Sequence, residues 1–137
     1  MKTIYQTTAE VSGGRNGKVK SNDGILDLEV RLPKAMGGAN DDFTNPEQLF
    51  AAGYAACFDN ALIYVAHQQK IRIKSKLEVT VALQMSETEG YNLCVQIEAD
   101  IQGTDAETAQ KLLEQAHATC PYSKAIKGNV VVELKLK

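Results

Sequence analysis

The chain has 137 residues, the length of one domain, and 44% of them are apolar and 23% charged. This is the composition of a globular protein with a real core, and it excludes a disordered or fibrous chain. Fifteen basic and 17 acidic residues leave a net charge of −2, and there is no Trp. The chain therefore lacks the cationic field and the aromatic surface of nucleic-acid-binding proteins. We expect a single domain over residues 1–137 and no nucleic-acid partner.

The first residues, Met1 to Tyr5, lack the charged start, apolar stretch and small-residue cleavage site of a signal peptide. We therefore expect a cytoplasmic protein, in a reducing compartment where structural disulfides are rare. The three cysteines, Cys57, Cys94 and Cys120, are too few and too widely spaced for a disulfide scaffold or a zinc ribbon. Cysteines of this kind are catalytic, metal-binding or simply buried.

The first third of the chain predicts strands joined by glycine-rich turns. A strand-like segment over residues 4–11 precedes a turn over 13–17, and a second turn follows at 22–24. Apolar and charged residues then alternate over 26–32, which is the period of a half-buried strand that ends before Pro33.

A loop leads to a long helix predicted from residue 46 to about 69, with Thr44 or Asn45 as its N-cap and Pro46 at its first position. This helix is apolar on every face over 49–66, so it is either buried or spans a membrane. An Asp-Asn pair interrupts the apolar stretch, and Gly and Ala are abundant, so we expect no membrane partner. We predict a central helix, buried by its own domain or by a second subunit.

The second half predicts two alternating strands, over 77–85 and 93–101, and then a helix over 104–119 opened by a capping box. Pro121 disfavours helical backbone at the preceding residue, so the chain should break or change direction there. A closing strand is predicted over 130–136. The pattern is that of an α+β domain with about six strands, a long buried central helix and a second helix.

Each cysteine has its own local interpretation. Cys94 shares the polar face of its strand and is predicted to be incidental. Cys57 lies midway along the apolar helix, where a packed core thiol is the ordinary interpretation of such a residue taken alone. Cys120 lies at a helix-to-proline junction, where nearby backbone N–H groups can lower the pKa of a thiol. His117 shares a helix face with Cys120, but no paired Cys-x-x-Cys ligands are present, so we expect no metal site.

Three blocks of the sequence are distinctive: TNPEQLFAAGYAACF over 44–58, AHATCPYSKA over 116–125 followed by Gly128-Asn129, and the GGRNG turn over 13–17. They resemble the organic hydroperoxide resistance (Ohr) branch of the OsmC/Ohr family of thiol peroxidases. Their order and spacing fit the family, and the resemblance runs nearly end to end. It replaces the ordinary interpretation of Cys57.

The resemblance implies a metal-free cysteine peroxidase that acts on organic, fatty-acid-type hydroperoxides. By motif match, Cys57 is the peroxidatic cysteine, Cys120 the resolving cysteine, and Arg15 and Glu47 the charged pair beside the reactive thiol. It also implies an intertwined homodimer with two active sites at the subunit interface. The electron donor is expected to be a dihydrolipoyl group on a lipoylated protein, and no bound cofactor is expected.

These residue types suit the chemistry. A thiolate attacks the peroxide oxygen, so the pKa of Cys57 must be lowered, and Arg15 held by Glu47 is suited to this task. Glu47 and Cys57 are ten residues apart, about 15 Å along a straight helix and roughly 80° around it. Either the helix breaks near Gly53, or Glu47 and Arg15 approach Cys57 from the other subunit.

An apolar vestibule near the thiol would favour alkyl hydroperoxides, because burial of each methylene contributes about 0.8 kcal/mol. The residues proposed for it from proximity in the sequence are Phe50, Tyr54, Phe58 and Tyr122, with Leu49, Met36 and Phe43.

Three alternatives stay open. The chain could be a broader OsmC-type peroxidase that also reduces hydrogen peroxide, although the early Arg15 and the Cys-Pro-Tyr-Ser segment resemble the organic-hydroperoxide branch more closely. It could be a non-enzymatic redox sensor or thiol–metal module that uses Cys57, Cys120 and His117. It could also be a carrier of small apolar ligands.

Overall fold

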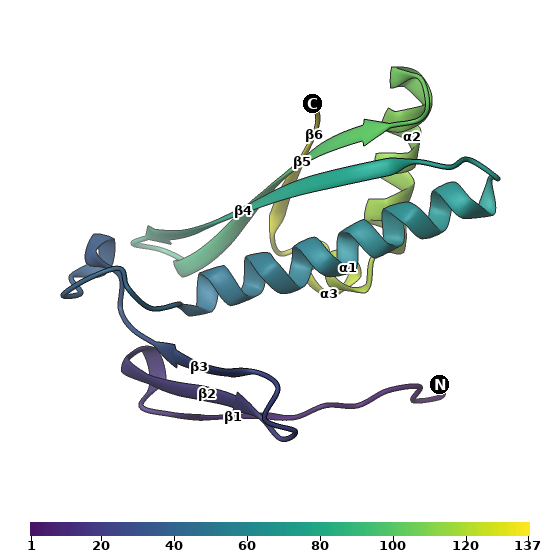
Figure 1. Cartoon of the computed structure of the whole chain (residues 1–137). Coiled ribbons are helices and arrows are strands. Elements are labelled where there is room, and N and C mark those ends of the chain that lie inside the picture. The colour runs from purple at the N-terminus through teal and green to yellow at the C-terminus, as the bar shows by residue number, and fades with distance from the viewer. The chain divides into compact units, whose positions relative to one another are not determined.

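The structure is a computed structural model that describes residues 1–137. The chain divides into two compact units, Met1–Leu49 and Phe50–Lys137. It contains six strands in two three-stranded sheets and three α-helices (Figure 1). The predicted α+β class is confirmed.

The first unit holds an antiparallel sheet of β1 (Ala9–Ser12), β2 (Gly17–Ser21) and β3 (Asp27–Val30), in that order. A short 3₁₀ helix, η1 (Gly14–Asn16), connects β1 to β2, and a second, η2 (Lys34–Met36), follows β3. The strands are shorter than the sequence pattern predicts, because residues 4–8 at the start of the strand-like segment pair with no strand.

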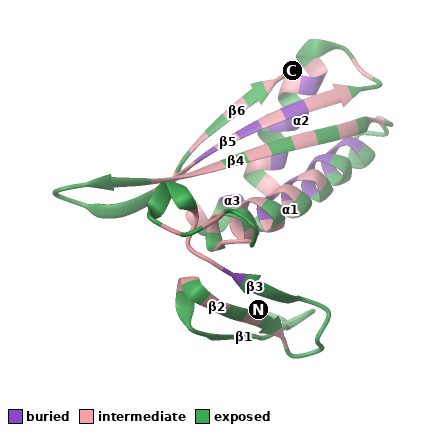
Figure 2. Cartoon of the chain, turned by 60° about the vertical axis from the view of Figure 1, so that its left-hand side comes forward, coloured by how far each residue is buried: buried purple, intermediate pink, exposed green.

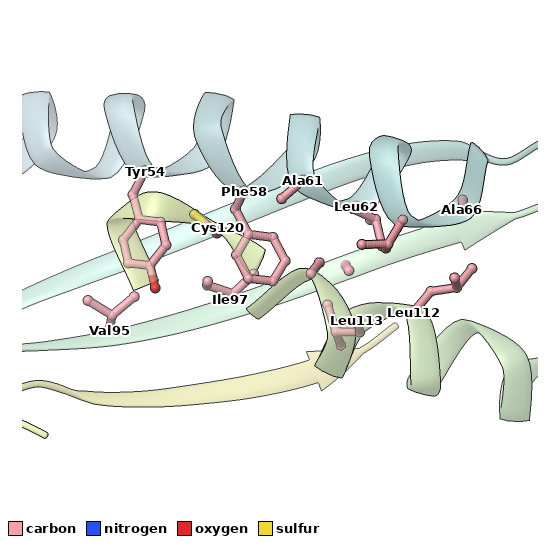
Figure 3. Packing of buried hydrophobic residues seen from close by; sticks show 13 residues of the cluster. Tyr54, Phe58, Ala61, Leu62, Ala66, Val95, Ile97, Leu112, Leu113 and Cys120 are labelled. Atoms are coloured by element: carbon pink, nitrogen blue, oxygen red, sulfur yellow. The ribbon is translucent and has the colours of Figure 1, made fainter. Parts of the chain in front are cut away.

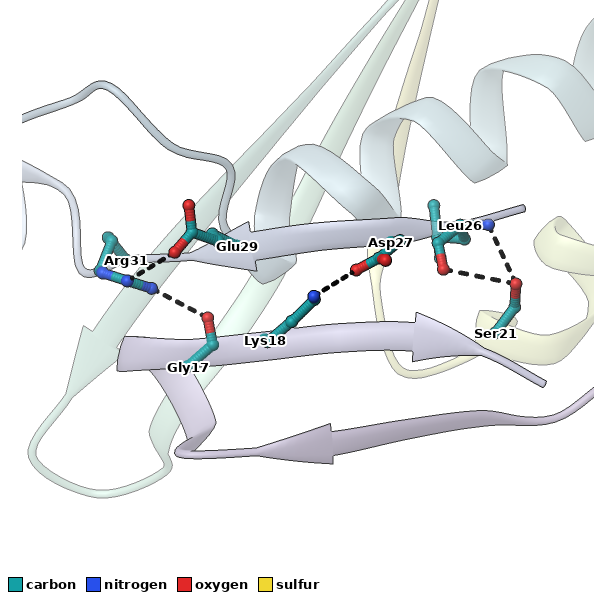
Figure 4. Close-up of polar contacts among 7 residues, drawn as sticks. All are labelled: Gly17, Lys18, Ser21, Leu26, Asp27, Glu29 and Arg31. Atoms are coloured by element: carbon teal, nitrogen blue, oxygen red, sulfur yellow. Dashed lines mark hydrogen bonds and ion pairs between the residues drawn. The ribbon is translucent and has the colours of Figure 1, made fainter. Parts of the chain in front are cut away.

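Polar contacts join β2 to β3 across the surface of this sheet (Figure 4). Lys18 Nζ lies 3.0 Å from Asp27 Oδ1, and Arg31 Nη1 donates to the carbonyl oxygen of Gly17 over 2.9 Å. Exposed ion pairs contribute little to stability because water screens them. The only buried hydrophobic residue of the unit is Val30, and most of the sheet is exposed (Figure 2). The first unit therefore has no core of its own in the single chain.

The second unit is built on a long β-hairpin. Strands β4 (Lys74–Ser86) and β5 (Gly90–Gln102) pair antiparallel along their whole length, and β6 (Val131–Leu136) pairs parallel to β5 at the other edge. The helices are α1 (Pro46–Gln68), whose first turn belongs to the first unit, α2 (Ala106–Thr119) and α3 (Pro121–Ile126). The hairpin strands are longer than predicted, and α3 is an additional helix.

One hydrophobic core joins α1, α2 and β5 (Figure 3). Its largest fully buried side chains come from all three elements and from the residue that precedes α3, namely Tyr54, Phe58, Leu62, Ile97, Leu112, Leu113 and Cys120. The buried positions of α1 recur at intervals of three and four residues, so they form one stripe along the helix.

The remaining apolar surface of α1 is uncovered in the single chain. Ile63 and Tyr64 are 48% and 52% exposed. By length and composition alone α1 could also cross a membrane, although its buried stripe packs in the core as in a globular protein. The prediction that α1 is buried on every face is thus met on one face only.

Side-chain caps define where both long helices begin. Asn45 Oδ1 accepts from the backbone N–H of Gln48 over 2.9 Å, so Asn45 rather than Thr44 caps α1. At α2 the predicted capping box is wrong, because Asp105 is the N-cap and accepts from the N–H of Thr108 over 2.8 Å. The carboxylate of Asp105 reaches this N–H from extended backbone, which leaves Thr104 outside the helix.

Candidate active site

Cys57 and Cys120 lie side by side in the second unit. Their sulfur atoms are 3.6 Å apart, and both thiols are free. Cys57 projects from the middle of α1 and is partly exposed, whereas Cys120 joins α2 to α3 and has no exposed surface. A disulfide has an S–S length of about 2.05 Å, so the two atoms need to approach by only about 1.5 Å to form one.

The backbone of Cys120 explains how its side chain reaches α1. Its extended conformation, φ −59° and ψ 124°, ends α2 and begins α3 with Pro121 at the first helical position. The N–H of Cys120 donates to the carbonyl of Ala116 over 2.8 Å, and its own carbonyl accepts from Lys124 over 3.0 Å. Cys120 is therefore held by the last hydrogen bond of one helix and the first of the next.

The surroundings of Cys57 in the second unit raise the pKa of its thiol. Burial raises the pKa of the Cys57 thiol above its ordinary value, the backbone N–H of Tyr122 lowers it by hydrogen bonding, and the neighbouring Cys120 raises it again. The balance of these effects is a raised pKa. A nearby cation would lower this pKa, and none of the residues that shift it is one.

Arg15 and Glu47 form a bidentate ion pair in the first unit. Arg15 Nη1 and Nη2 donate to the two carboxylate oxygens of Glu47 over 2.8 and 2.5 Å. This pairing raises the pKa of Arg15, and it lowers the pKa of Glu47, whose partial burial acts in the opposite direction. The pair fixes the plane of the guanidinium and leaves the Arg15 side chain one third exposed.

The turn that carries Arg15 depends on a close approach of two backbone segments. A Cβ at Gly17 would lie 1.7 Å from the carbonyl oxygen of Ser12, so only glycine fits at that position. The tight turn holds Arg15 on η1, opposite the first turn of α1, where Glu47 lies.

Tyr54, Ser123 and His117, which are close in sequence to the two cysteines, are joined by hydrogen bonds. Ser123 on α3 is 3% exposed, and its Oγ lies 2.6 Å from Tyr54 Oη and 2.9 Å from His117 Nδ1. Burial lowers the pKa of His117, and Lys127 adds to this effect; burial also raises the pKa of Tyr54, against the hydrogen bond to Ser123. No sequence pattern assigns a role to Ser123, because a lone serine carries no signal of burial.

The four aromatic residues proposed for an apolar vestibule differ in their exposure. Tyr54 and Phe58 have no exposed surface and belong to the hydrophobic core of the single chain. Phe50 is partly buried against the core and contacts Tyr54 edge-on. Tyr122 is 41% exposed; its backbone hydrogen-bonds to Cys57, and its ring packs against Gly53 and Tyr54. Of the four aromatic residues, only Phe50 and Tyr122 offer surface.

The other vestibule residues belong to the first unit. Met36 and Phe43 are both 38% exposed, and the guanidinium of Arg31 lies 4.9 Å from the centre of the Phe43 ring. Leu49 is partly buried at the start of α1.

The structure brings no third metal-binding side chain to His117 and Cys120, and no group of three such residues occurs elsewhere. Cys94 lies on β5 and lines a shallow hollow of about 490 Å³ between Thr80 and Val131. A hollow of about 560 Å³ at the end of α1, lined by His67 and Arg72, contains neither Cys57 nor Cys120.

The comparisons with known proteins agree with one another. Residues 38–135 match the family described as OsmC-like protein. The chain is 47% identical to the organic hydroperoxide resistance protein OhrB of Bacillus subtilis, over 98% of both chains. Among solved structures, an organic hydroperoxide resistance protein of Legionella pneumophila aligns with a TM-score of 0.95 and 44% identity over 99% of both chains. One from Elizabethkingia anophelis aligns with a TM-score of 0.94 and 49% identity, over 100% of this chain and 99% of that one.

Proposed function

The chain belongs to the OsmC-like family, among its organic hydroperoxide resistance proteins, and we propose that it is a cysteine-based peroxidase that reduces organic hydroperoxides to alcohols. The observation that carries this proposal is the pair of free thiols 3.6 Å apart, one partly exposed and one buried. Resistance to organic hydroperoxides, part of the defence against oxidative stress, follows from removing them.

The reaction proceeds in two steps at this pair. The thiolate of Cys57 attacks the terminal peroxide oxygen; the S–O bond forms, the O–O bond breaks, and the alkoxide leaves and takes up a proton to become the alcohol. Cys57 is then a sulfenic acid. The thiol of Cys120 attacks that sulfur; the S–S bond forms, the S–O bond breaks, and hydroxide leaves with the thiol proton as water.

Arg15, held by Glu47, supplies the positive charge that is missing around Cys57 in the second unit. A guanidinium beside Cys57 lowers the pKa of the thiol and stabilises the alkoxide as it leaves. Glu47 holds the guanidinium through two hydrogen bonds, which reduces the mobility of a long side chain.

We propose that this charge comes from a second copy of the chain. Helix α1 is continuous from Pro46 to Gln68, so the alternative of a break near Gly53 is wrong. Glu47 therefore stays about 15 Å along the helix from Cys57 of its own chain. The uncovered apolar side of α1 and the coreless first unit both favour burial in a homodimer.

A dihydrolipoyl group on a lipoylated protein is the proposed reductant. Its two thiols exchange with the Cys57–Cys120 disulfide; both cysteines return to thiols and the lipoyl group becomes a cyclic disulfide. No bound cofactor is needed, because the electrons pass between sulfur atoms. The reducing cytoplasm is the expected compartment.

The test is steady-state reduction of cumene hydroperoxide and of a fatty-acid hydroperoxide, with a dihydrolipoamide regenerating system. We expect turnover for the wild type and for Cys94→Ser, the matched control that removes the third cysteine. We expect none for Cys57→Ser. Cys120→Ser should pass its first turnover and then accumulate the sulfinic acid of Cys57, seen by mass spectrometry.

Two results would change the proposal. Oxidation of Cys57 once per chain, with no turnover by any lipoyl donor, would make the protein a redox sensor. Equal turnover of hydrogen peroxide and organic hydroperoxides would place it with broader OsmC-type peroxidases. Thioredoxin and glutathione in place of dihydrolipoamide should support little turnover.

A further inference from the structure

Ser123 lies where three helices meet. Its hydroxyl contacts Tyr54 of α1 over 2.6 Å and His117 of α2 over 2.9 Å, while Ser123 itself belongs to α3. With an exposed fraction of 3%, Ser123 is the only buried polar residue in the chain. A buried hydroxyl that loses its partners carries a desolvation cost, so these two contacts constrain where α3 can lie.

The two hydrogen bonds of Ser123 involve the hydroxyl protons of Tyr54 and Ser123 and the Nδ1 atom of His117. Burial favours the neutral form of His117, whose Nδ1 can then accept. With Nδ1 unprotonated, Ser123 can donate to His117 Nδ1 while Tyr54 donates to Ser123 Oγ, and each hydroxyl proton then has an acceptor. The three side chains form one hydrogen-bonded chain with Ser123 in the middle.

The three hydrogen-bonded side chains lie within three residues of Cys57 or Cys120 in the sequence. His117 and Ser123 lie three residues before and three residues after Cys120, so their contact sets the angle between α2 and α3 at the Cys120 junction. Tyr54 lies three residues before Cys57 on α1, so its contact with Ser123 sets the separation of α3 from that turn of α1. Both variables determine the distance between the two sulfurs.

We propose that Ser123 is the positioning residue for disulfide formation, because its bonds to Tyr54 and His117 hold Cys120 Sγ within reach of Cys57 Sγ. This inference rests on the proposed function. The step concerned is attack of the Cys120 thiol on the Cys57 sulfenic acid, in which the S–S bond replaces the S–O bond and water leaves. A loosened α3 slows this step and leaves the sulfenic acid exposed to a second hydroperoxide molecule.

The test is single-turnover oxidation of reduced protein by cumene hydroperoxide, followed by quenching and mass spectrometry. Relative to its own rate of first thiol loss, we expect Ser123→Ala to form the disulfide about fivefold or more slowly than the wild type, and to accumulate sulfinic acid in proportion. Tyr54→Phe, which removes only the hydroxyl, should behave alike. His117→Asn keeps an acceptor near the position of Nδ1 and should restore the rate that His117→Ala loses.

Ser75→Ala is the matched control. It removes a serine hydroxyl that donates to Asp59 on α1 over 2.6 Å, but it leaves α3 untouched. We expect wild-type disulfide formation in this variant. Equal slowing in Ser75→Ala and Ser123→Ala would overturn the inference, because general loosening of α1 would then be the cause.

Different experimental results would overturn this inference and the proposed function. Wild-type protein that forms no Cys57–Cys120 disulfide would overturn both. Wild-type protein that forms it, together with Ser123→Ala and Tyr54→Phe forming it equally fast, would overturn the positioning role alone.

Discussion

The sulfur atoms of Cys57 and Cys120 lie 3.6 Å apart although 63 residues separate them in the chain. One sulfur is partly exposed on α1, and the other is buried where α2 gives way to α3. This difference in exposure matches the proposed division of labour. In the proposed reaction a hydroperoxide reaches Cys57 first, and burial protects Cys120 from direct oxidation until the sulfenic acid forms beside it.

Gly53 and Tyr122 should be energetically coupled. A Cβ at Gly53 would lie 2.8 Å from Tyr122 Oη, so Gly53→Ala displaces the Tyr122 ring. Alanine raises helix propensity by about 0.5–1 kcal/mol, but in the wild type this gain is offset by the displaced ring. In a Tyr122→Ala background the full gain should appear. Denaturant unfolding of the four proteins gives the coupling, and a value near zero would contradict the predicted contact.

Arg15 should control the ionisation of Cys57. In Arg15→Ala we expect the pKa of the Cys57 thiol to rise by about 1 to 3 pH units, because the positive charge of the Arg15 guanidinium is lost. The pH dependence of iodoacetamide alkylation, measured in a Cys94→Ser/Cys120→Ser background, reports this pKa. Arg31→Ala is the matched control, since it removes another partly exposed guanidinium of the first unit. The same alkylation profile in Arg15→Ala and the wild type would refute the role of Arg15.

Mixed dimers should reveal which chain supplies Arg15. Neither Cys57→Ser nor Arg15→Ala should be active alone. If Arg15 of one chain serves Cys57 of the other, each mixed dimer has one intact site, and an equimolar mixture regains about a quarter of wild-type turnover. Peroxidase activity after unfolding and joint refolding is the measurement. No recovery, with mixed dimers verified by native mass spectrometry, would place Arg15 and Cys57 of one site in the same chain.

Glu47 should make the first unit sensitive to acid. Its pKa in the folded protein is lowered from the ordinary value of 4.5, mainly by the hydrogen bonds from Arg15. Its contribution to the free energy of unfolding is therefore complete above about pH 4.5 and is lost as the pH falls through the folded pKa. Near neutral pH we expect Glu47→Gln to destabilise the protein by about 1 kcal/mol, reduced by the solvent exposure of Arg15.

Urea unfolding of the wild type and Glu47→Gln across this pH range measures the difference. The two proteins should converge in acid, where both side chains are uncharged. A difference that stays constant with pH would show that the ion pair is not its source.

The sequence pattern predicted most of the fold because its signals are local. The alternation over 93–101 and the apolar helix with its Asn45 and Pro46 start both appear in the structure. Boundaries were less accurate, since strand ends depend on the partner strand: β4 and β5 extend each other to the tip of their hairpin. The helix α3 was missed because a proline can either end a helix or begin one.

For the candidate site, too, the sequence predicted some features and not others. Family resemblance in the motifs selected Cys57, Cys120, Arg15 and Glu47, and the structure joins them into two pairs, one in each unit. The pattern placed Tyr54 near the thiol, yet it could not show that the Tyr54 hydroxyl is buried against Ser123.

The sequence by itself determined the α+β class, the family and the residue types of a thiol site, because periodicity, capping and motif spacing are properties of neighbouring residues. The tertiary structure decided which side of α1 is buried, that Cys57 and Cys120 lie within 3.6 Å, and that Ser123 links three helices. These relations join residues far apart in the chain. They depend on how the helices pack in the core, which no local pattern of residues specifies.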